Sequence, residues 1–147
     1  MSEGIETVDI IDPWLWSTLS TDATLLGMLP GTDKTKSIIS TLAVGGVPAP
    51  YVAFFCSSPH DILAVGGERV DVEALYTVKA VGEGASWNTV KTIARRIDAL
   101  LHKKDLDTPN GHISSRRDLV IQYAEVDAGT QFRHLGGVYR IRAYSTP

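Results

Sequence analysis

Cysteine is nearly absent from this sequence, because Cys56 is the only one among 147 residues. A single cysteine excludes an internal disulfide and a zinc site built on several thiolates. Cys56 stands in an apolar run, so we expect a buried and unreactive thiol. The four histidines lack the short spacings of metal-binding pairs, and the sequence therefore predicts no metal site. They are His60, His102, His112 and His134.

Long apolar runs and a basic leader are also missing. No apolar run approaches the roughly 20 residues that a membrane helix needs. The first residues, MSEGIETVDII, are acidic where a secretory signal would be basic. We therefore expect a soluble protein of a reducing cytoplasm, with no membrane partner.

The net charge is small, at -3, which disfavours general coating of DNA. The charge is nevertheless uneven. Residues 1–74 carry ten acidic and three basic side chains, whereas residues 75–147 carry seven acidic and eleven basic ones. Three interpretations stay open: neighbouring copies meet acid to base, the basic half meets an anionic partner, or both sets are simply solvated.

The chain length and the order of apolar patterns predict one domain of the α+β class. We expect an N-terminal arm over residues 1–11 and the domain over residues 12–147. Asp12 and Pro13 predict a helix start, since aspartate caps helices and proline fits the first turn. A second, short helical turn is expected to begin at Ser20-Thr21-Asp22 and to end before Pro30-Gly31. The sheet is expected to be mainly antiparallel, packed on one face by the N-terminal helix and one long central helix.

Alternating and helical patterns place the remaining elements. A helix over residues 87–104 carries an apolar stripe, and Ser86 can cap it. Residues 38–44 fit a strand or a loop. Gly136 and Gly137 predict a bulge or a close backbone approach in the last strand. The expected strands are residues 50–58, 72–81, 118–126 and 131–144, and the expected long connections are residues 59–71 and 105–117.

The Gly82-Glu83-Gly84 turn between strand and helix has the order of a dinucleotide-binding loop. Such a loop needs a third glycine where the helix packs on the strand, and Trp87 occupies that place. The leading βαβ unit and the later acidic residue of that motif are also missing. We therefore interpret the turn as structural, with Trp87 packing against the fold.

Nucleophilic catalysis has little support in the sequence. Cys56, His60 and Asp61 lie close together along the chain, but a catalytic triad is assembled from separated elements. No paired carboxylates stand inside an apolar run, where an acid with a raised pKa would be expected. The sequence predicts no enzyme and no cofactor.

The ordered set of elements resembles the tail terminator, or tail-completion, proteins of long-tailed bacteriophages. The likeness spans nearly the whole chain and contains no catalytic signature. The opening helix leads into 19-LSTDATLLGML-29, and 48-PAPYVAFFCSS-58 enters a strand. The strand–helix unit 72-VEALYTVKAVGEGASWNTVKTIARRIDALLHKK-104 follows, and 116-RRDLVIQYAEVDAGTQFRHLGGVYRIR-142 is the closing hairpin.

The resemblance implies a structural protein, not an enzyme, that forms a ring, expected to be a hexamer. The ring would sit on the head-proximal end of the tail tube, stop tube polymerisation and present the surface that joins the head. Its partners would be other copies, the tail tube protein and the head–tail connector or neck proteins. DNA would only pass through the lumen. The implied location is the virion tail, after synthesis in the host cytoplasm.

Candidate contact residues lie in the basic last strand and in the two long connections. Arg140 and Arg142 share one face of that strand. We expect a subunit interface there and not the lumen, because a lumen that lets DNA slide should not grip phosphate. The connections are expected to contact tube or connector proteins, since loops on a rigid scaffold usually carry binding. The candidate interface residues are Tyr139, Arg140, Arg142, Arg116 and Arg117. The candidate tube or connector contacts are Asp61, Glu68, Arg69, Asp105, Asp107 and His112.

Three other functions fit the sequence. The first is another phage neck component, such as a head-completion or connector-adaptor protein, which would be found on heads and not on tails. The second is an enzyme or small-ligand module built on the Gly-Glu-Gly turn, which nucleotides or metals would stabilise. The third is a cellular protein that forms homodimers through its sheet. Arg116 and Arg117, beside His112, also fit a phosphate contact or a plain surface loop.

Overall fold

The computed structural model describes residues 7–40, 47–63 and 69–144 of the chain, with side chains from residues 10–40, 47–59, 62 and 71–144. Within these ranges, six strands form one mixed sheet in the order β1-β2-β3-β6-β5-β4. Only the β1–β2 pair is parallel among them. The helices are α1 (Thr7–Ser20), α2 (Ala23–Leu26) and α3 (Asn88–Leu101), with a 3-10 turn, η1 (Lys34–Ser37). The strands are β1 (Ile38–Ile39), β2 (Tyr51–Leu63), β3 (Arg69–Glu83), β4 (Lys104–Thr108), β5 (Gly111–Asp127) and β6 (Thr130–Tyr144).

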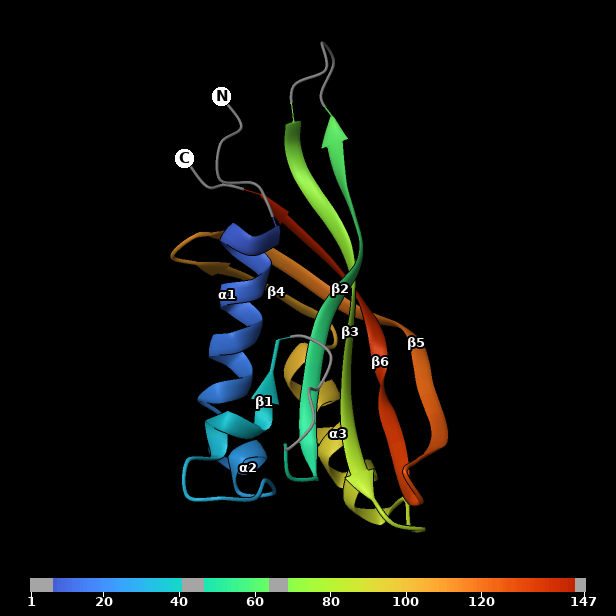
Figure 1. Cartoon of the computed structure of the whole chain (residues 1–147). Helices are drawn as coiled ribbons and strands as arrows, with labels where there is room; N and C mark the ends of the chain where they lie inside the picture. Colours follow the sequence, from blue (N-terminus) through green and yellow to red (C-terminus); the bar gives the residue numbers. More distant parts are fainter. Residues whose placement is uncertain (1–6, 41–46, 64–68, 145–147) are drawn as a thin grey trace.

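The core lies between one face of the sheet and the helices α1 and α3 (Figure 1). The alternation in β3 places its apolar even-numbered residues on that face, and the α3 stripe packs against them. Two buried tyrosines tie the helices down: Tyr76 Oη donates to Asp12 of α1, and Tyr139 Oη donates to Asp98 of α3 at 3.0 Å. This confirms the predicted α+β class. In the described residues no helix is long and apolar enough to cross a bilayer.

The first helix begins earlier than we predicted. Residues 7–11, expected to belong to an extended arm, are helical, and Pro13 lies inside α1 instead of at its start. The physical reason is burial, because Ile10 and Ile11 are completely buried and continue the apolar face formed by Leu15 and Leu19. Asp12 is therefore not a cap. The prediction of a short second helix is confirmed, since Asp22 caps α2 by accepting from the Leu25 amide at 2.8 Å.

The connection expected over residues 59–71 is mostly strand. β2 continues through Pro59 to Leu63, and β3 begins at Arg69. Proline is tolerated because β1 covers only Val52 and Ala53 of β2, which leaves Pro59 on an open edge where its missing N–H breaks no ladder. In the described part of residues 38–44, only Ile38 and Ile39 form a strand.

The prediction of a long connection over residues 105–117 is also wrong, because these residues belong to the β-hairpin formed by β4 and the first part of β5. β4 pairs with the first part of β5, from Lys104 opposite Ser115 to Thr108 opposite Gly111. The Thr108 hydroxyl accepts from the Asn110 and Gly111 amides and closes the turn. Leu106 packs inward against the core, which is the burial that fixes this short strand.

The α3 helix matches the prediction except at its ends. It ends at Leu101, so Lys103 and Lys104 lie beyond it, and Lys104 opens β4. The N-cap position is held by Trp87, while the Ser86 hydroxyl accepts from the Asn88 amide at 3.2 Å. Sequence reasoning placed the helix correctly because its apolar stripe is long and regular.

The closing hairpin is present, as the order of the sequence patterns indicated, and it contains the close approach predicted for its glycines. Ala128 and Gly129 form its two-residue turn with positive φ angles of 49° and 82°, as the favoured hairpin turns require. Gly136 makes the expected close approach, since a Cβ there would lie 2.5 Å from the Lys79 Cα of the neighbouring strand. Gly137 pairs with Val120, one position beyond the β5 bulge, which lies between Arg117 and Leu119 opposite Tyr139 and Val138.

Candidate interaction surfaces

The Gly82-Glu83-Gly84 turn is built for packing. Gly84 has a φ of 104°, and its amide donates to the Gln131 carbonyl at 2.9 Å. A Cβ on Gly82 would lie 2.7 Å from a Val90 methyl carbon, so the first helical turn fills the space beside it. Trp87 stacks under the Arg133 guanidinium at 4.9 Å. These contacts are those of a strand-to-helix turn, in agreement with the structural interpretation.

Cys56 is half-buried, and burial raises the pKa of its thiol, with the Ser58 amide acting in the opposite direction. A raised pKa keeps the sulfur in its unreactive thiol form near neutral pH. The side chains of His60 and Asp61 lie outside the described residues, so their relation to Cys56 stays a sequence hypothesis. In the part of the chain that the structure describes, no cluster of three or more His, Cys, Asp or Glu side chains is arranged to hold a metal ion.

The basic residues of β6 are paired within their own chain. Arg140 bridges Glu73 of β3 and Asp118 of β5, the latter at 2.9 Å. Arg142 donates from Nε to Asp71 at 2.6 Å. Both arginines lie on one face of the sheet, as their alternation predicted, and this is the face opposite the helices. Their assignment to a subunit interface stays a prediction, and any such contact has to share these internal carboxylates.

The other three candidate interface residues have different environments. Tyr139 is buried under α3, where burial and Asp98 raise the pKa of its hydroxyl. Arg117 Nε lies 3.6 Å from Asp98 Oδ1, on the helix side of the sheet. Arg116 is exposed and lies opposite Arg140 across the strand pair, so two positive charges face each other. Among the described residues Arg116 has no carboxylate partner.

Three of the six candidate tube or connector residues come together on the β4–β5 hairpin. His112 Nδ1 lies 2.7 Å from Asp107 Oδ1, and its Nε2 contacts Asp105. The carboxylates of Asp107 and then Asp105 raise the pKa of His112, whose ring also stacks on Tyr144 at 4.9 Å. Both ring nitrogens can donate only in the protonated form. Glu68 and the side chains of Asp61 and Arg69 lie outside the described residues, so their roles stay predictions.

Sequence reasoning missed a polar cluster on the sheet face opposite the helices. Lys79 is buried there and donates to Tyr123 Oη at 2.7 Å. The Tyr123 ring stacks on His134 at 4.3 Å, and His134 Nε2 lies 2.6 Å from Glu125. Burial lowers the pKa of His134, although Glu125 acts to raise it. The available signal was Lys79 itself, a charge in the middle of an apolar strand pattern.

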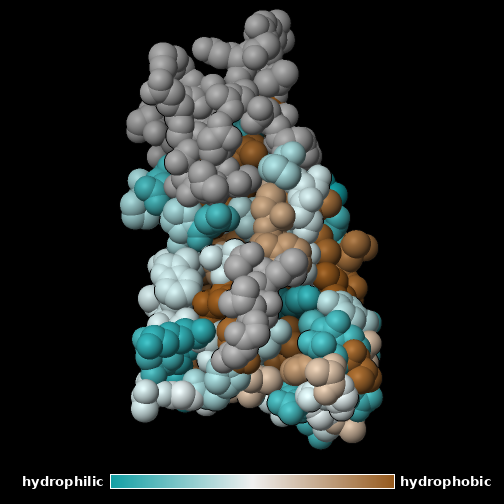
Figure 2. Space-filling model, viewed as in Figure 1, coloured by the Kyte–Doolittle hydropathy of each residue, from teal (hydrophilic) through white to brown (hydrophobic). Residues whose placement is uncertain are grey.

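The second half of β5 forms an open edge of the sheet. β4 covers β5 only from Gly111 to Ser115, so residues 116–127 have no strand on their outer side among the described residues. Figure 2 shows apolar surface along the right-hand margin, where β5 lies in Figure 1. The exposed apolar side chains of this segment are Leu119, Val120, Tyr123 and Val126, with exposed fractions from 43% to 69%.

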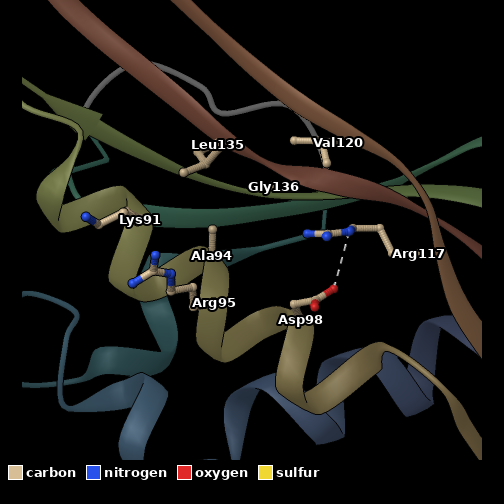
Figure 3. Close-up of a pocket in the computed structure, with 8 residues that line it drawn as sticks. All are labelled: Lys91, Ala94, Arg95, Asp98, Arg117, Val120, Leu135 and Gly136. Atoms are coloured by element: carbon tan, nitrogen blue, oxygen red, sulfur yellow. Dashed lines mark ion pairs between the residues drawn. The ribbon is translucent and has the colours of Figure 1, made fainter.

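A shallow pocket of about 290 Å³ lies between α3 and the β5–β6 hairpin. Lys91 and Arg95 lie at one end, and the Arg117–Asp98 ion pair closes the other (Figure 3). Val120 contributes to its apolar side, so the pocket adjoins the open β5 edge. The sequence did not predict this pocket, because its lining residues come from α3, β5 and β6, which are separated along the chain.

Comparison with known proteins gives a likeness of fold. No protein-family model and no curated protein matches the chain. The chain is similar to a chain in the virion of a native gene transfer agent (GTA) particle, with a TM-score of 0.61 and 16% identity, over 89% of this chain and 92% of that one. A second solved chain is 11% identical over 74% of this chain and 79% of its own. Its TM-score of 0.48 is too low to indicate a shared fold. At such identities the likeness establishes a shared fold alone.

Proposed function

We propose that this chain is a structural protein of a virion, and within that class a tail terminator. The observation that carries the proposal is the fold shared over nearly the full length of both chains with a component of a GTA virion particle. The likeness covers nearly the whole domain and is not limited to one helix or strand. The ordered sequence features that resemble phage tail terminators select the more specific role within the virion.

In this role, copies of the chain form a ring, expected to be a hexamer, on the head-proximal end of the tail tube. The ring stops addition of tube subunits and offers its other side to connector or neck proteins, and DNA passes through the lumen. A rigid sheet clamped by two helices suits a stop of this kind, because capping depends on a fixed shape and not on chemistry. Asp61 in β2, Arg69 at the start of β3 and the intervening Glu68 remain our candidates for contact with the tube or connector.

The test is negative-stain imaging of the purified protein mixed with tail tubes that lack a cap. We expect density on one end of each tube and an arrest of further tube growth. Tubes that are already capped serve as the matched control and should recruit nothing. Protein that ignores open tubes would contradict the terminator role.

The same experiment separates the neighbouring role in the neck. A head-completion or connector-adaptor protein should bind isolated heads and leave tubes bare. Incubating the chain with isolated heads and with isolated tails in parallel therefore assigns it to one half of the particle.

A further inference from the structure

The open edges of the sheet are protected unequally. Proteins blunt exposed edges with short strands, prolines, bulges or lysines, because an open edge pairs with other chains. Here β1 has two residues, β2 carries Pro59 and a bulge between Cys56 and Ser58, and β4 has five residues before Pro109. Residues 119–127 of β5 contain no proline or lysine and lie beyond its bulge. The β5 edge is therefore the one among the described strands that is suited to receive another strand.

The side chains of this edge favour a partner with apolar surface on both faces. Leu119 and Tyr123 lie on the face away from the helices, and Val120 and Val126 lie on the other face. A strand added alongside would cover both sets, while the main chain supplies the hydrogen bonds. The edge is 12 residues long, counted from Arg116 to Asp127, so its partner is also a long strand.

The charges along the edge are self-complementary. Arg116 stands at its start and Asp127 at its end, and both are exposed and have no ion pair within the described residues. In an antiparallel pair of two β5 strands, the basic start of each lies beside the acidic end of the other. A parallel pair would instead place like charges together.

The register supports this pairing. When Gln122 lies opposite Gln122 of the partner subunit, Ile121 lies opposite Tyr123 of the partner subunit. The bulge after Arg117 shifts the register by one residue. Arg116 then lies opposite Asp127 of the partner subunit, and both side chains are on the face away from the helices.

We propose that the isolated chain forms a two-fold symmetric dimer in which residues 116–127 of β5 pair antiparallel with the same segment of a second copy. The inference goes beyond the proposed function and does not rest on it. The dimer is the proposed state of the free protein in solution, whereas the ring is the proposed state of the protein on the tail tube. A two-fold contact is closed and adds no further copies. It covers the exposed edge before the protein meets its target.

The test uses two single charge reversals, Arg116→Glu and Asp127→Arg. Each homodimer would then carry two like-charged contacts, so sedimentation should show both variants shifted towards monomer relative to the wild type. An equimolar mixture restores both opposite-charge contacts in a heterodimer, and we expect it to recover the dimer. Lys36→Glu and Glu83→Arg, which make the same charge changes at exposed sites elsewhere, are the matched controls and should leave the dimer unchanged.

Hydrogen exchange gives an independent readout. The outward-pointing amides of residues 118–127, which are not bonded to β6, should exchange slowly in the wild-type dimer and rapidly in either monomeric variant. A wild type that stays monomeric at its highest soluble concentration overturns the inference. Variants that associate as well as the wild type, or a mixture no better than its components, overturn it as well. Tube capping is scored separately, so the failure of one proposal is distinguishable from the failure of the other.

Discussion

At the scale of single residues, Gly136 is the described glycine at which an added Cβ would have least room. A Cβ at this position would meet the Lys79 Cα at 2.5 Å, and backbone does not move aside as a flexible side chain does. We expect Gly136→Ala to lower the free energy of unfolding by about 1–3 kcal/mol, as overpacking does. Denaturant unfolding measures the loss. Ser114→Ala, on an exposed position of β5, is the control and should change stability by less than about 0.5 kcal/mol.

The protonation of His112 stabilises the fold, because Asp107 and Asp105 raise the pKa of this histidine. The folded state then binds the proton more tightly than the unfolded chain, whose histidine pKa is about 6.5. The stabilisation is complete below that value and is lost as the pH rises through the higher pKa of the folded state. We expect the difference in melting temperature between wild type and His112→Gln to shrink from pH 5 to pH 8. A difference that does not vary with pH would contradict this assignment.

The protonation of His134 has the opposite effect on stability. Burial lowers its pKa, and its contribution is therefore complete above about pH 6.5 and lost as the pH falls through the pKa of the folded state. The groups that face it are Glu125, Lys79 and Tyr123. We expect His134→Gln to lose less stability than the wild type between pH 7 and pH 5, measured by thermal unfolding. The two histidine variants should thus show opposite pH trends.

At the scale of the elements, Asp22 fixes α2 to α3. Its carboxylate caps α2 through the Leu25 amide and accepts from Arg96 Nε at 2.8 Å and Nη2 at 2.6 Å. We expect Asp22→Ala to cost about 1–2 kcal/mol of unfolding free energy, mostly through the lost cap. Asp22→Asn keeps a capping oxygen and removes the charge, so it should lose less. Equal losses in chemical denaturation would show that the cap contributes nothing.

Sequence patterns predicted the elements whose signal is long and repetitive. The α3 helix and the alternating faces of β3 were correct because many residues agree on one period. The start of α1 was missed because the capping signal of Asp12 and Pro13 outweighed the apolar Ile10 and Ile11. Pro59 suggested a connection, and it is compatible with a strand only because β2 lies at an edge. The edge position of β2 depends on the order of strands in the sheet, which the sequence around Pro59 does not reveal.

The candidate surfaces were predictable in part. Asp105, Asp107 and His112 were chosen because they lie in one polar stretch, and the hairpin does bring them into contact. The internal partners of Arg140 and Arg142 were not predictable, since Asp71 and Glu73 come from a strand far away in sequence. Tyr139 was placed on a surface, but it shares its alternation with core residues and is buried.

At the scale of the whole molecule, net charge and the open edge act together. The isoelectric point is near 5.7, where electrostatic repulsion between copies vanishes while the apolar β5 edge remains. We expect a solubility minimum close to that pH, measured by precipitation with a crowding polymer. Val126→Lys should raise solubility at the minimum, because a lysine on an edge opposes pairing with other chains. Ser114→Lys is the control, because its side chain is exposed but its backbone is already paired with β4.

The central pair of the sheet also determines the order in which the chain can fold. β3 pairs with β6 from Val72 opposite Ala143 to Glu83 opposite Phe132, so its second neighbour follows it about fifty residues later along the chain. Closing so long a loop is entropically costly, and sheets with such distant pairings fold slowly. A nascent chain that ends before residue 130 therefore presents all of β3 as a vacant strand edge. Translation of the β5–β6 hairpin is the step that removes this vulnerability to mispairing.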